Sequence, residues 1–215
     1  MLDSFDVVLF DNDGVLVDTE PLFLRATQEV LATVGVVIDA EVYRQISLVR
    51  GESVFELAKE RGLSTLEISK LRERRDARYA ELIGAGVEVL PGVRSTLRRL
   101  DGIRPMAIVT SAERWDFEEV HSRTGLLGHF EFVLASGDYP RHKPHPDPYL
   151  VAAARFGVEP ERCLVIEDTE RGLAAAHAAG MACIAIPQAL SRASDFSRAA
   201  RVLESMEELA DVLGL

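Results

Sequence analysis

Short apolar runs alternate with segments of helical periodicity from residue 88 to the end of the chain. These runs lack the polar alternation of a half-exposed strand, so they are typical of strands covered on both faces. Strands that alternate with helices in this way indicate βαβ units and a parallel sheet. With the first apolar run of the chain included, we predict strands at Val7–Phe10, Pro105–Thr110, Phe130–Ala135, Cys163–Ile166, Ala182–Ile186 and Arg201–Leu203. The helices predicted between or after them are Pro91–Leu100, Glu113–Arg123, Pro146–Phe156, Thr169–Ala179 and Ser205–Leu213.

Residues 17–87 have helical periodicity throughout and contain no good strand pattern. Apolar residues recur at every fourth position from Leu22 to Val34, and Pro21 suits the first turn of a helix. Further helices are predicted at Ala40–Ser47, Ser53–Arg61 and Ser64–Leu82. Because this helical block directly follows the first strand, we expect it to lie over the carboxyl ends of the strands, where open α/β sheets bind ligands.

The first strand leads directly into Asp11-Asn12-Asp13-Gly14. Two carboxylates one residue apart at the end of a buried strand are costly unless a cation lies near them. Gly14 permits the tight turn that directs both acids into one crevice. A solvated turn is the alternative interpretation, since Asp, Asn and Gly are common turn residues. Apolar residues on both sides of the turn favour a functional site instead.

Three later segments place polar groups next to predicted strands or loops. Thr110 and Ser111 follow the second strand, where hydroxyls near a helix start suit a phosphate, although such a pair is commonly only a helix cap. Lys143 lies in a loop stiffened by three prolines, and a loop lysine is normally solvated. Glu167 and Asp168 follow the fourth strand and repeat the pattern of acids after a buried run.

Taken together, these groups predict one site at the carboxyl edge of the sheet. Crowded carboxylates repel one another, and a hard divalent cation with oxygen ligands relieves the repulsion. Mg²⁺ fits, because it commonly binds one or two carboxylates together with waters and substrate phosphate. Lys143 would then neutralise the remaining charge and contact the phosphate as a point charge.

Composition narrows the range of partners. The net charge of −11 argues against non-specific binding of nucleic acid or of an anionic membrane, but local cations or a metal still allow an anionic substrate. The N-terminus shows no signal-peptide pattern, and no apolar run reaches the length of a membrane span. Cys163 and Cys183 are too few for a disulfide framework, so we expect buried thiols in a cytoplasmic protein. We also expect a monomer or a weak homodimer.

The four groups resemble, in order, the four motifs of the haloacid dehalogenase-like superfamily. The matching segments of this chain are FDNDGVLVDTE, VTS, KP and IEDT. The fit is best to the subgroup that contains β-phosphoglucomutase and the phosphoglycolate phosphatases. The resemblance implies an α/β fold with a Rossmann-like parallel-sheet core, formed by residues 1–16 and 88–215, and an inserted all-helical cap of the C1 type, formed by residues 17–87.

The resemblance also implies how the catalytic residues act. Asp11 is the nucleophile that forms an aspartyl-phosphate. Asp13 is the general acid that protonates the leaving oxygen and the general base that then activates water. Thr110, Ser111 and Lys143 contact the phosphate.

The same resemblance implies a Mg²⁺ site. Asp11, the backbone carbonyl of Asp13 and Asp168 are its expected ligands, and Glu167 binds the metal directly or through water. Dehalogenases of the superfamily lack both the second acid and the metal, so Asp13 argues against that branch. The implied function is hydrolysis of a small phosphorylated metabolite, such as a sugar phosphate or a phosphoglycolate-like compound.

The main alternative is a β-phosphoglucomutase-like sugar-phosphate mutase. Mutases of this type carry a histidine where Phe23 stands and a cap arginine where Val54 stands, so both departures favour a phosphatase. Arg50 is the cap residue that we expect to contact the substrate, although a solvated loop cation is an equal alternative. Another cap arginine in the cleft, such as Arg44 or Arg78, would favour the mutase.

A receiver-like signalling domain is the alternative that is not an enzyme. Such domains also combine an acidic pocket with a hydroxyl and a lysine, but they are shorter and have no helical insert. They also place the lysine after all of their acids, whereas Lys143 precedes Glu167 and Asp168. These differences favour the enzyme.

Overall fold

A six-stranded sheet with strand order β3-β2-β1-β4-β5-β6 organises the computed structural model, which describes residues 4–214. Every neighbouring pair of strands is parallel, and β1 lies between β2 and β4. The strands are β1 (Val7–Phe10), β2 (Met106–Val109), β3 (Phe132–Leu134), β4 (Cys163–Glu167), β5 (Ala182–Ala185) and β6 (Arg201–Val202). The α/β class predicted from the alternating pattern is confirmed.

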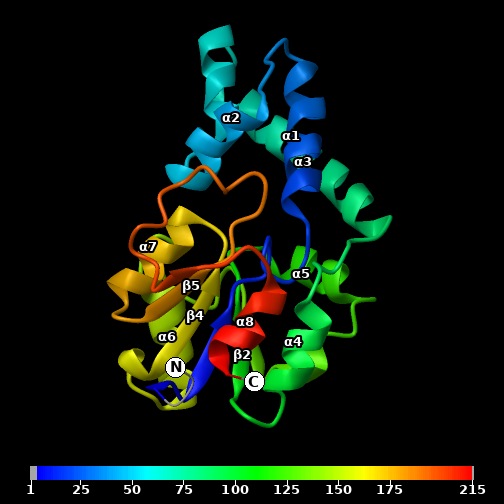
Figure 1. The fold of residues 1–215 in the computed structure, drawn as a ribbon. Coiled ribbons are helices and arrows are strands. Elements are labelled where there is room, and N and C mark those ends of the chain that lie inside the picture. The colour runs from blue at the N-terminus through cyan, green and yellow to red at the C-terminus, as the bar shows by residue number, and fades with distance from the viewer. Residues whose placement is uncertain (1–3, 215) are drawn as a thin grey trace.

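Helices cover both faces of the sheet (Figure 1). They are α4 (Val93–Leu100), α5 (Arg114–His121), α6 (Asp147–Phe156), α7 (Glu170–Ala178) and α8 (Met206–Leu213), with short 3₁₀ turns at Leu127–His129 and Pro160–Arg162. Val8 and Phe10 of β1 pack into an apolar cluster with α4 and α8, whereas Val7 and Leu9 pack into a second cluster with α6 and α7. Alternate residues of a strand face opposite sides, so continuous apolar runs fit a sheet buried on both faces.

The remaining helices form a separate group above the carboxyl ends of the strands (Figure 1). They are α1 (Glu20–Ala32), α2 (Ala40–Tyr43), a π-helix (Arg44–Val49), a 3₁₀ helix (Val54–Arg61) and α3 (Thr65–Gly84). Most of the buried apolar side chains of this group share a cluster of their own. Of residues 17–87, none belongs to a strand of the sheet, and Val17 makes only isolated bridges to Asp13 and Val89.

Two predicted helices of this group differ in type from an ordinary α-helix. The helix expected over Ala40–Ser47 is α-helical only to Tyr43 and continues as the π-helix. The one expected over Ser53–Arg61 is a 3₁₀ helix. By contrast, Ser64 and Glu67 form the predicted capping box, in which each side chain accepts a hydrogen bond from the other's backbone N–H.

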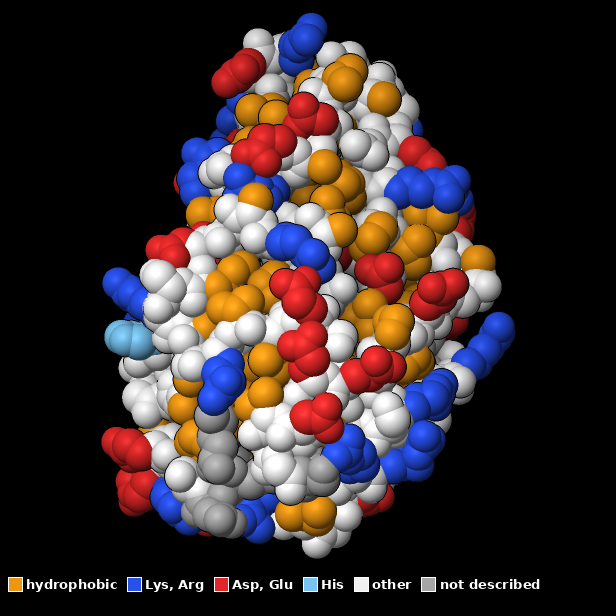
Figure 2. Space-filling model, viewed as in Figure 1, with side chains coloured by type: hydrophobic (Ala, Val, Ile, Leu, Met, Phe, Trp, Pro, Cys, Tyr) orange, Lys and Arg blue, Asp and Glu red, His pale blue; other side chains and the backbone are white. Residues whose placement is uncertain are grey.

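None of the helices within residues 4–214 is long and apolar enough to span a membrane. Figure 2 shows acidic and basic side chains interspersed over one face of the molecule.

Candidate active site

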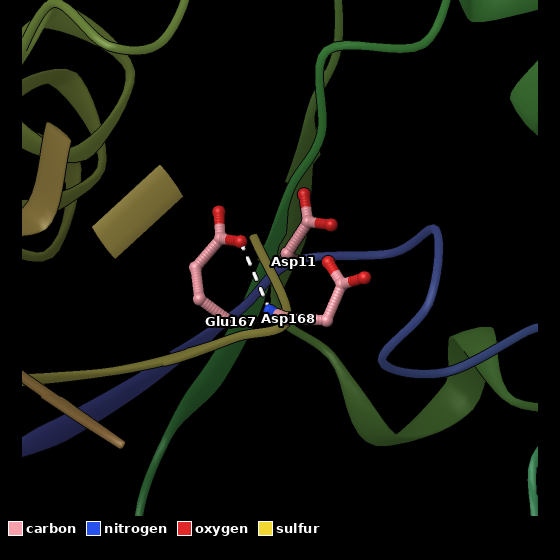
Figure 3. Close-up of side chains that lie close together, drawn as sticks. All are labelled: Asp11, Glu167 and Asp168. Carbon is pink, nitrogen blue, oxygen red and sulfur yellow. Dashed lines mark hydrogen bonds between the residues drawn. The ribbon is translucent and has the colours of Figure 1, made fainter. Parts of the chain in front are cut away.

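Two paired strands bring three of the predicted acids together. Asp11 follows β1, while Glu167 ends β4 and Asp168 follows it; β1 and β4 pair in parallel. One carboxylate oxygen from each residue lies within 4.8 Å of the other two. Figure 3 shows the carboxylates of Asp11 and Asp168 directed toward the same space, with Glu167 beside them.

Lys143 supplies the cation that these acids require. Its Nζ lies 2.6 Å from Oδ1 of Asp11, 2.7 Å from Oε1 of Glu167 and 2.9 Å from the carbonyl oxygen of Val109. Burial opposes its charge, but the carboxylates of Asp11 and Glu167 outweigh burial and raise the pKa of Lys143. The loop lysine is therefore a charged, buried partner of both strands.

One ammonium does not balance three buried carboxylates. Burial raises the pKa of Asp11, although Lys143 opposes the shift. Burial and the charges of Glu167 and Asp11 raise the pKa of Asp168 well above its usual value. Oδ1 of Asp168 is buried and, among the described residues, has no hydrogen-bond partner. Oxygen ligands with excess negative charge and an unpaired buried oxygen fit a divalent metal ion.

The turn after β1 is shaped closely around this cluster. Gly14 has a φ of +81°, and a Cβ there would lie 2.2 Å from Oδ2 of Asp168. Only glycine combines that conformation with so close an approach. Asp11 and Asp13, on either side of Asn12 in this turn, both line the same cavity.

Asp13 is held by two hydroxyl groups. Thr19, at the start of α1, donates to Oδ1 of Asp13. Thr110, which follows β2, donates to Oδ2 of Asp13 at 3.1 Å and accepts from the backbone N–H of Ala112. Thr110 is fully buried, and it is Ser111 that lines the cavity in front of the acids. The predicted contact of Thr110 with phosphate therefore stays a prediction, while its contact with Asp13 is found in the structure.

A cavity of about 930 Å³ lies between the strand ends and the helical group. Asp11, Asp13, Lys143, Glu167 and Asp168 line it on the side of the sheet. Aromatic side chains line it from the helical group, namely Phe23, Tyr43, Phe55 and Tyr79. This size suits a small-molecule ligand.

Arg50 is not brought to this cavity. Its Nε donates to the carbonyl oxygen of Gln45 at 3.2 Å, and its guanidinium lies 3.4 Å from Glu52 at the surface. The next residue, Gly51, lines the cavity instead. In this geometry Arg50 does not reach the cavity in which a substrate would bind. Its position fits the alternative interpretation from sequence, a solvated loop cation.

The other two arginines considered from sequence also lie elsewhere. Arg44 pairs with Glu41, and Arg78 pairs with Glu29, each at 2.6 Å. Neither is among the residues that line the cavity.

Two arginines that the sequence reasoning missed do line the cavity: Arg75 of α3 and Arg171 of α7. A signal for Arg75 was present, since it interrupts the apolar stripe of α3 between Leu71 and Tyr79, both of which are buried. A cation at the spacing of a buried stripe indicates a cavity or an ion pair. Arg171 had no comparable signal, because it lies in a polar first turn of a helix.

The fold and this acidic centre together define an α/β enzyme with its site at the carboxyl edge of a parallel sheet, beneath a helical group. The model of the family "haloacid dehalogenase-like hydrolase" matches residues 8–186. The chain therefore belongs to the haloacid dehalogenase-like hydrolases, and the predicted family is confirmed.

Similar proteins agree with this membership. The chain is 33% identical over 184 residues to fructose-1-phosphate phosphatase YqaB of Escherichia coli, covering 84% of this chain and 96% of that protein. The crystal structure of CbbY from Rhodobacter sphaeroides in complex with phosphate has a TM-score of 0.81 and 28% identity, covering 98% of this chain and 100% of that one. A mutant of CbbY in complex with xylulose 1,5-bisphosphate has a TM-score of 0.80, 28% identity and coverage of 95% and 96%.

Proposed function

We propose that the protein is a Mg²⁺-dependent phosphatase of a small phosphorylated metabolite, a sugar phosphate or a phosphoglycolate-like compound. The observation that carries the proposal is the buried contact between Lys143 and Asp11, next to the unpaired oxygen of Asp168. This arrangement places the Asp11 carboxylate where it can act as a nucleophile. The ammonium of Lys143 lies on it, and the Asp168 carboxylate beside it can bind a metal ion. The similarity to a fructose-1-phosphate phosphatase supports the same reaction class.

Asp11 is the proposed nucleophile. Lys143 binds its Oδ1, which leaves Oδ2 to attack phosphorus. The P–O bond to the alcohol then breaks, and an aspartyl-phosphate forms. Lys143 also stabilises the negative charge on the phosphoryl oxygens. Water hydrolyses the aspartyl-phosphate, so that inorganic phosphate leaves and Asp11 is regenerated.

Asp13 is the proposed general acid and base. The hydroxyls of Thr19 and Thr110 bind its two carboxylate oxygens separately, and so orient the group. In protonated form it gives a proton to the leaving alcohol oxygen. It then takes a proton from the water that attacks the aspartyl-phosphate.

We assign Asp11, the backbone carbonyl of Asp13 and Asp168 as direct ligands of Mg²⁺. Glu167 has both oxygens occupied, because Oε1 accepts from Lys143 and Tyr149, and Oε2 accepts from the backbone N–H of Asp168. We therefore infer that it acts through a water. When bound, Mg²⁺ would neutralise the acids and the substrate phosphate.

We also propose the domain division expected from the sequence: a core of residues 1–16 and 88–215, and a cap of residues 17–87. The separate apolar cluster of the helical group supports this division. A cytoplasmic location and the absence of nucleic-acid and membrane partners stay predictions from the sequence. The monomeric or weakly dimeric state stays a prediction as well.

The mutase remains the second candidate because of Arg75, a cap arginine that lines the cavity. A mutase must hold a bisphosphate by its distal phosphate. However, Arg75 already pairs with Asp76 at 2.6 Å and lies over the ring of Phe23 at 4.2 Å. Phe23 and Val54 also line the cavity, and neither can supply a hydrogen bond or a charge from its side chain. These contacts favour hydrolysis over transfer to a second sugar phosphate.

The test is release of inorganic phosphate from a panel of phosphorylated metabolites, with Mg²⁺ and after removal of metal by EDTA. The matched control is Asp11→Asn, which is nearly isosteric and should abolish turnover without loss of the fold. Full activity after exhaustive chelation would contradict the metal site. A coupled assay with β-glucose 1-phosphate in which isomerisation outruns phosphate release would replace the phosphatase by the mutase.

A further inference from the structure

Arg171 lies where the core meets the helical group. It stands in the first turn of α7, three residues after Asp168, and lines the cavity with Asp168 and Thr169. Its side chain reaches the loop of the helical group at Gly51. A Cβ at Gly51 would lie 3.4 Å from Nη1 and 3.3 Å from Cδ of Arg171. The Arg171 side chain therefore extends from the core to the helical group, where it lies beside Gly51.

At least one N–H donor of the Arg171 guanidinium has no acceptor among the described residues. Nε of Arg171 is buried and lacks a hydrogen-bond partner within residues 4–214. Arg75, the other arginine that lines the cavity, is paired with Asp76 and stacked on Phe23. A buried donor without an acceptor is unfavourable, so an acceptor from outside the chain is expected to satisfy it.

Glu20 offers an acceptor within electrostatic reach of the Arg171 guanidinium. Glu20, which also lines the cavity, accepts a hydrogen bond from the hydroxyl of Tyr43 at Oε1. Burial raises the pKa of the Glu20 carboxyl, and the Tyr43 hydroxyl and the Arg171 guanidinium oppose that shift. Arg171 and Glu20 thus present donors and an acceptor within electrostatic reach of each other. Neighbouring hydroxyls of a polyol need both, since each hydroxyl donates one hydrogen bond and accepts others.

The charges that line the rest of the cavity disfavour a second strongly anionic group. Apart from the acids at the strand ends, the lining contains two arginines, Arg75 and Arg171, but five carboxylates: Glu20, Glu52, Asp76, Glu113 and Asp116. Burial raises the pKa of Asp116 to about 6, and the nearby negative charges of Asp76 and Asp13 add to that shift. A second phosphate dianion would be repelled by these charges, whereas neutral hydroxyls would not.

We propose that Arg171 determines specificity, binding with Glu20 the hydroxyls of an uncharged polyol or sugar leaving group. The inference rests on the proposed phosphatase function and goes beyond it, because it assigns a residue of the core to recognition of the leaving group. It also separates this protein from a bisphosphate-selective enzyme.

The experiment compares wild type with Arg171→Met, Arg171→Lys and the control Arg98→Met. Arg98 is exposed on α4 and does not line the cavity. The probes are fructose 1-phosphate, sorbitol 6-phosphate, fructose 1,6-bisphosphate and p-nitrophenyl phosphate, which carries no hydroxyl on its leaving group. For the better of the two polyhydroxylated monophosphates, Arg171→Met should lower kcat/KM about 10- to 100-fold, mainly through KM, as loss of a charged hydrogen bond predicts. With p-nitrophenyl phosphate the change should stay within about twofold.

Arg171→Lys keeps the charge but loses the planar set of donors, so its kcat/KM on the same monophosphate should lie between wild type and Arg171→Met. Arg98→Met should match wild type on every probe. Wild type should also prefer fructose 1-phosphate to fructose 1,6-bisphosphate.

Three outcomes would overturn the inference. Equal losses on all probes in Arg171→Met would make Arg171 a general contact between core and cap. A preference for the bisphosphate that depends on Arg171 would make it a second anion site. Turnover of p-nitrophenyl phosphate without turnover of either polyhydroxylated monophosphate would exclude the substrate class. By contrast, failure of wild type to hydrolyse any probe would reject the proposed phosphatase itself.

Discussion

His121 Nε2 lies 2.7 Å from Oδ1 of Asn12, the residue between the two aspartates of the turn after β1. Nδ1 of His121 is 2.8 Å from the hydroxyl of Thr124. The backbone carbonyl of Asn12 also accepts a hydrogen bond from Leu16 N–H at 2.8 Å. A side chain of α5 therefore helps to fix the turn that positions Asp11 and Asp13.

The burial of His121 makes the stability of the protein depend on pH. Burial lowers the pKa of His121 from 6.5 to about 4, so the folded protein keeps the ring neutral where the unfolded chain protonates it. The unfolded state then binds more protons, and the free energy of unfolding falls as pH decreases from 6.5 to 4, by up to about 3 kcal/mol from this group. Urea denaturation at pH 7, 5.5 and 4.5 measures the change.

His121→Phe isolates the contribution of His121, because other carboxyl groups titrate in both proteins. At pH 7 the variant should be about 1–3 kcal/mol less stable, since Asn12 loses a buried hydrogen bond. Its deficit should shrink toward pH 4. His177→Gln, at an exposed position of α7, is the control. A constant deficit at all pH values would show that the ring is not kept neutral by burial.

Lys143→Met should remove most activity, with kcat reduced by about 10²–10³-fold or more, because the charge beside Asp11 and the phosphate is lost. The exposed Lys70→Met of α3 should retain wild-type rates. Steady-state phosphate release is the measurement, with circular dichroism to verify folding. Near-normal kcat in folded Lys143→Met would remove Lys143 from catalysis.

Asp13→Asn should lower kcat about 10²–10⁴-fold on an alkyl phosphate, as expected for loss of a general acid. The rate of the first step, formation of the aspartyl-phosphate, should fall less with p-nitrophenyl phosphate, because p-nitrophenolate leaves without a proton. Single-turnover experiments compare the rate at which p-nitrophenol is released from p-nitrophenyl phosphate with the rate at which the alcohol is released from the alkyl phosphate. Equal losses for both leaving groups in that step would argue that Asp13 does not protonate the leaving oxygen.

Gly14→Ala should damage the site more than Gly35→Ala. Both glycines have positive φ values, +81° and +74°, so both substitutions carry backbone strain of about 1–2 kcal/mol. Only at Gly14 would the new Cβ meet Asp168, at 2.2 Å, whereas at Gly35 nothing lies within 4 Å. Thermal unfolding and kcat for the two variants should therefore differ, with the larger loss at Gly14. Similar losses of activity would mean that Asp168 can move aside freely.

The parallel sheet and the three carboxylates of the acidic cluster follow from local sequence. Continuous apolar runs require burial on both faces, and acids placed directly after two such runs must emerge at the same edge of a parallel sheet. Lys143 could also be placed at the site, but only through its motif, because its own loop contains no strand-end signal. The contacts it makes with Asp11 and Glu167 then account for its burial.

Tertiary packing determines which residues line the cavity. From sequence alone, Arg50 and Arg171 are both polar residues of loops or helix ends, yet the first remains at the surface and the second lines the cavity. Likewise, the hydroxyl of Thr110 is directed to Asp13, a residue almost one hundred positions away in the chain. Periodicity reports which face of an element is buried, and therefore determined the sheet and its acidic edge. Which side chains of the helical group meet that edge depends on how two separately packed clusters dock, and that relationship is set by contacts between distant residues.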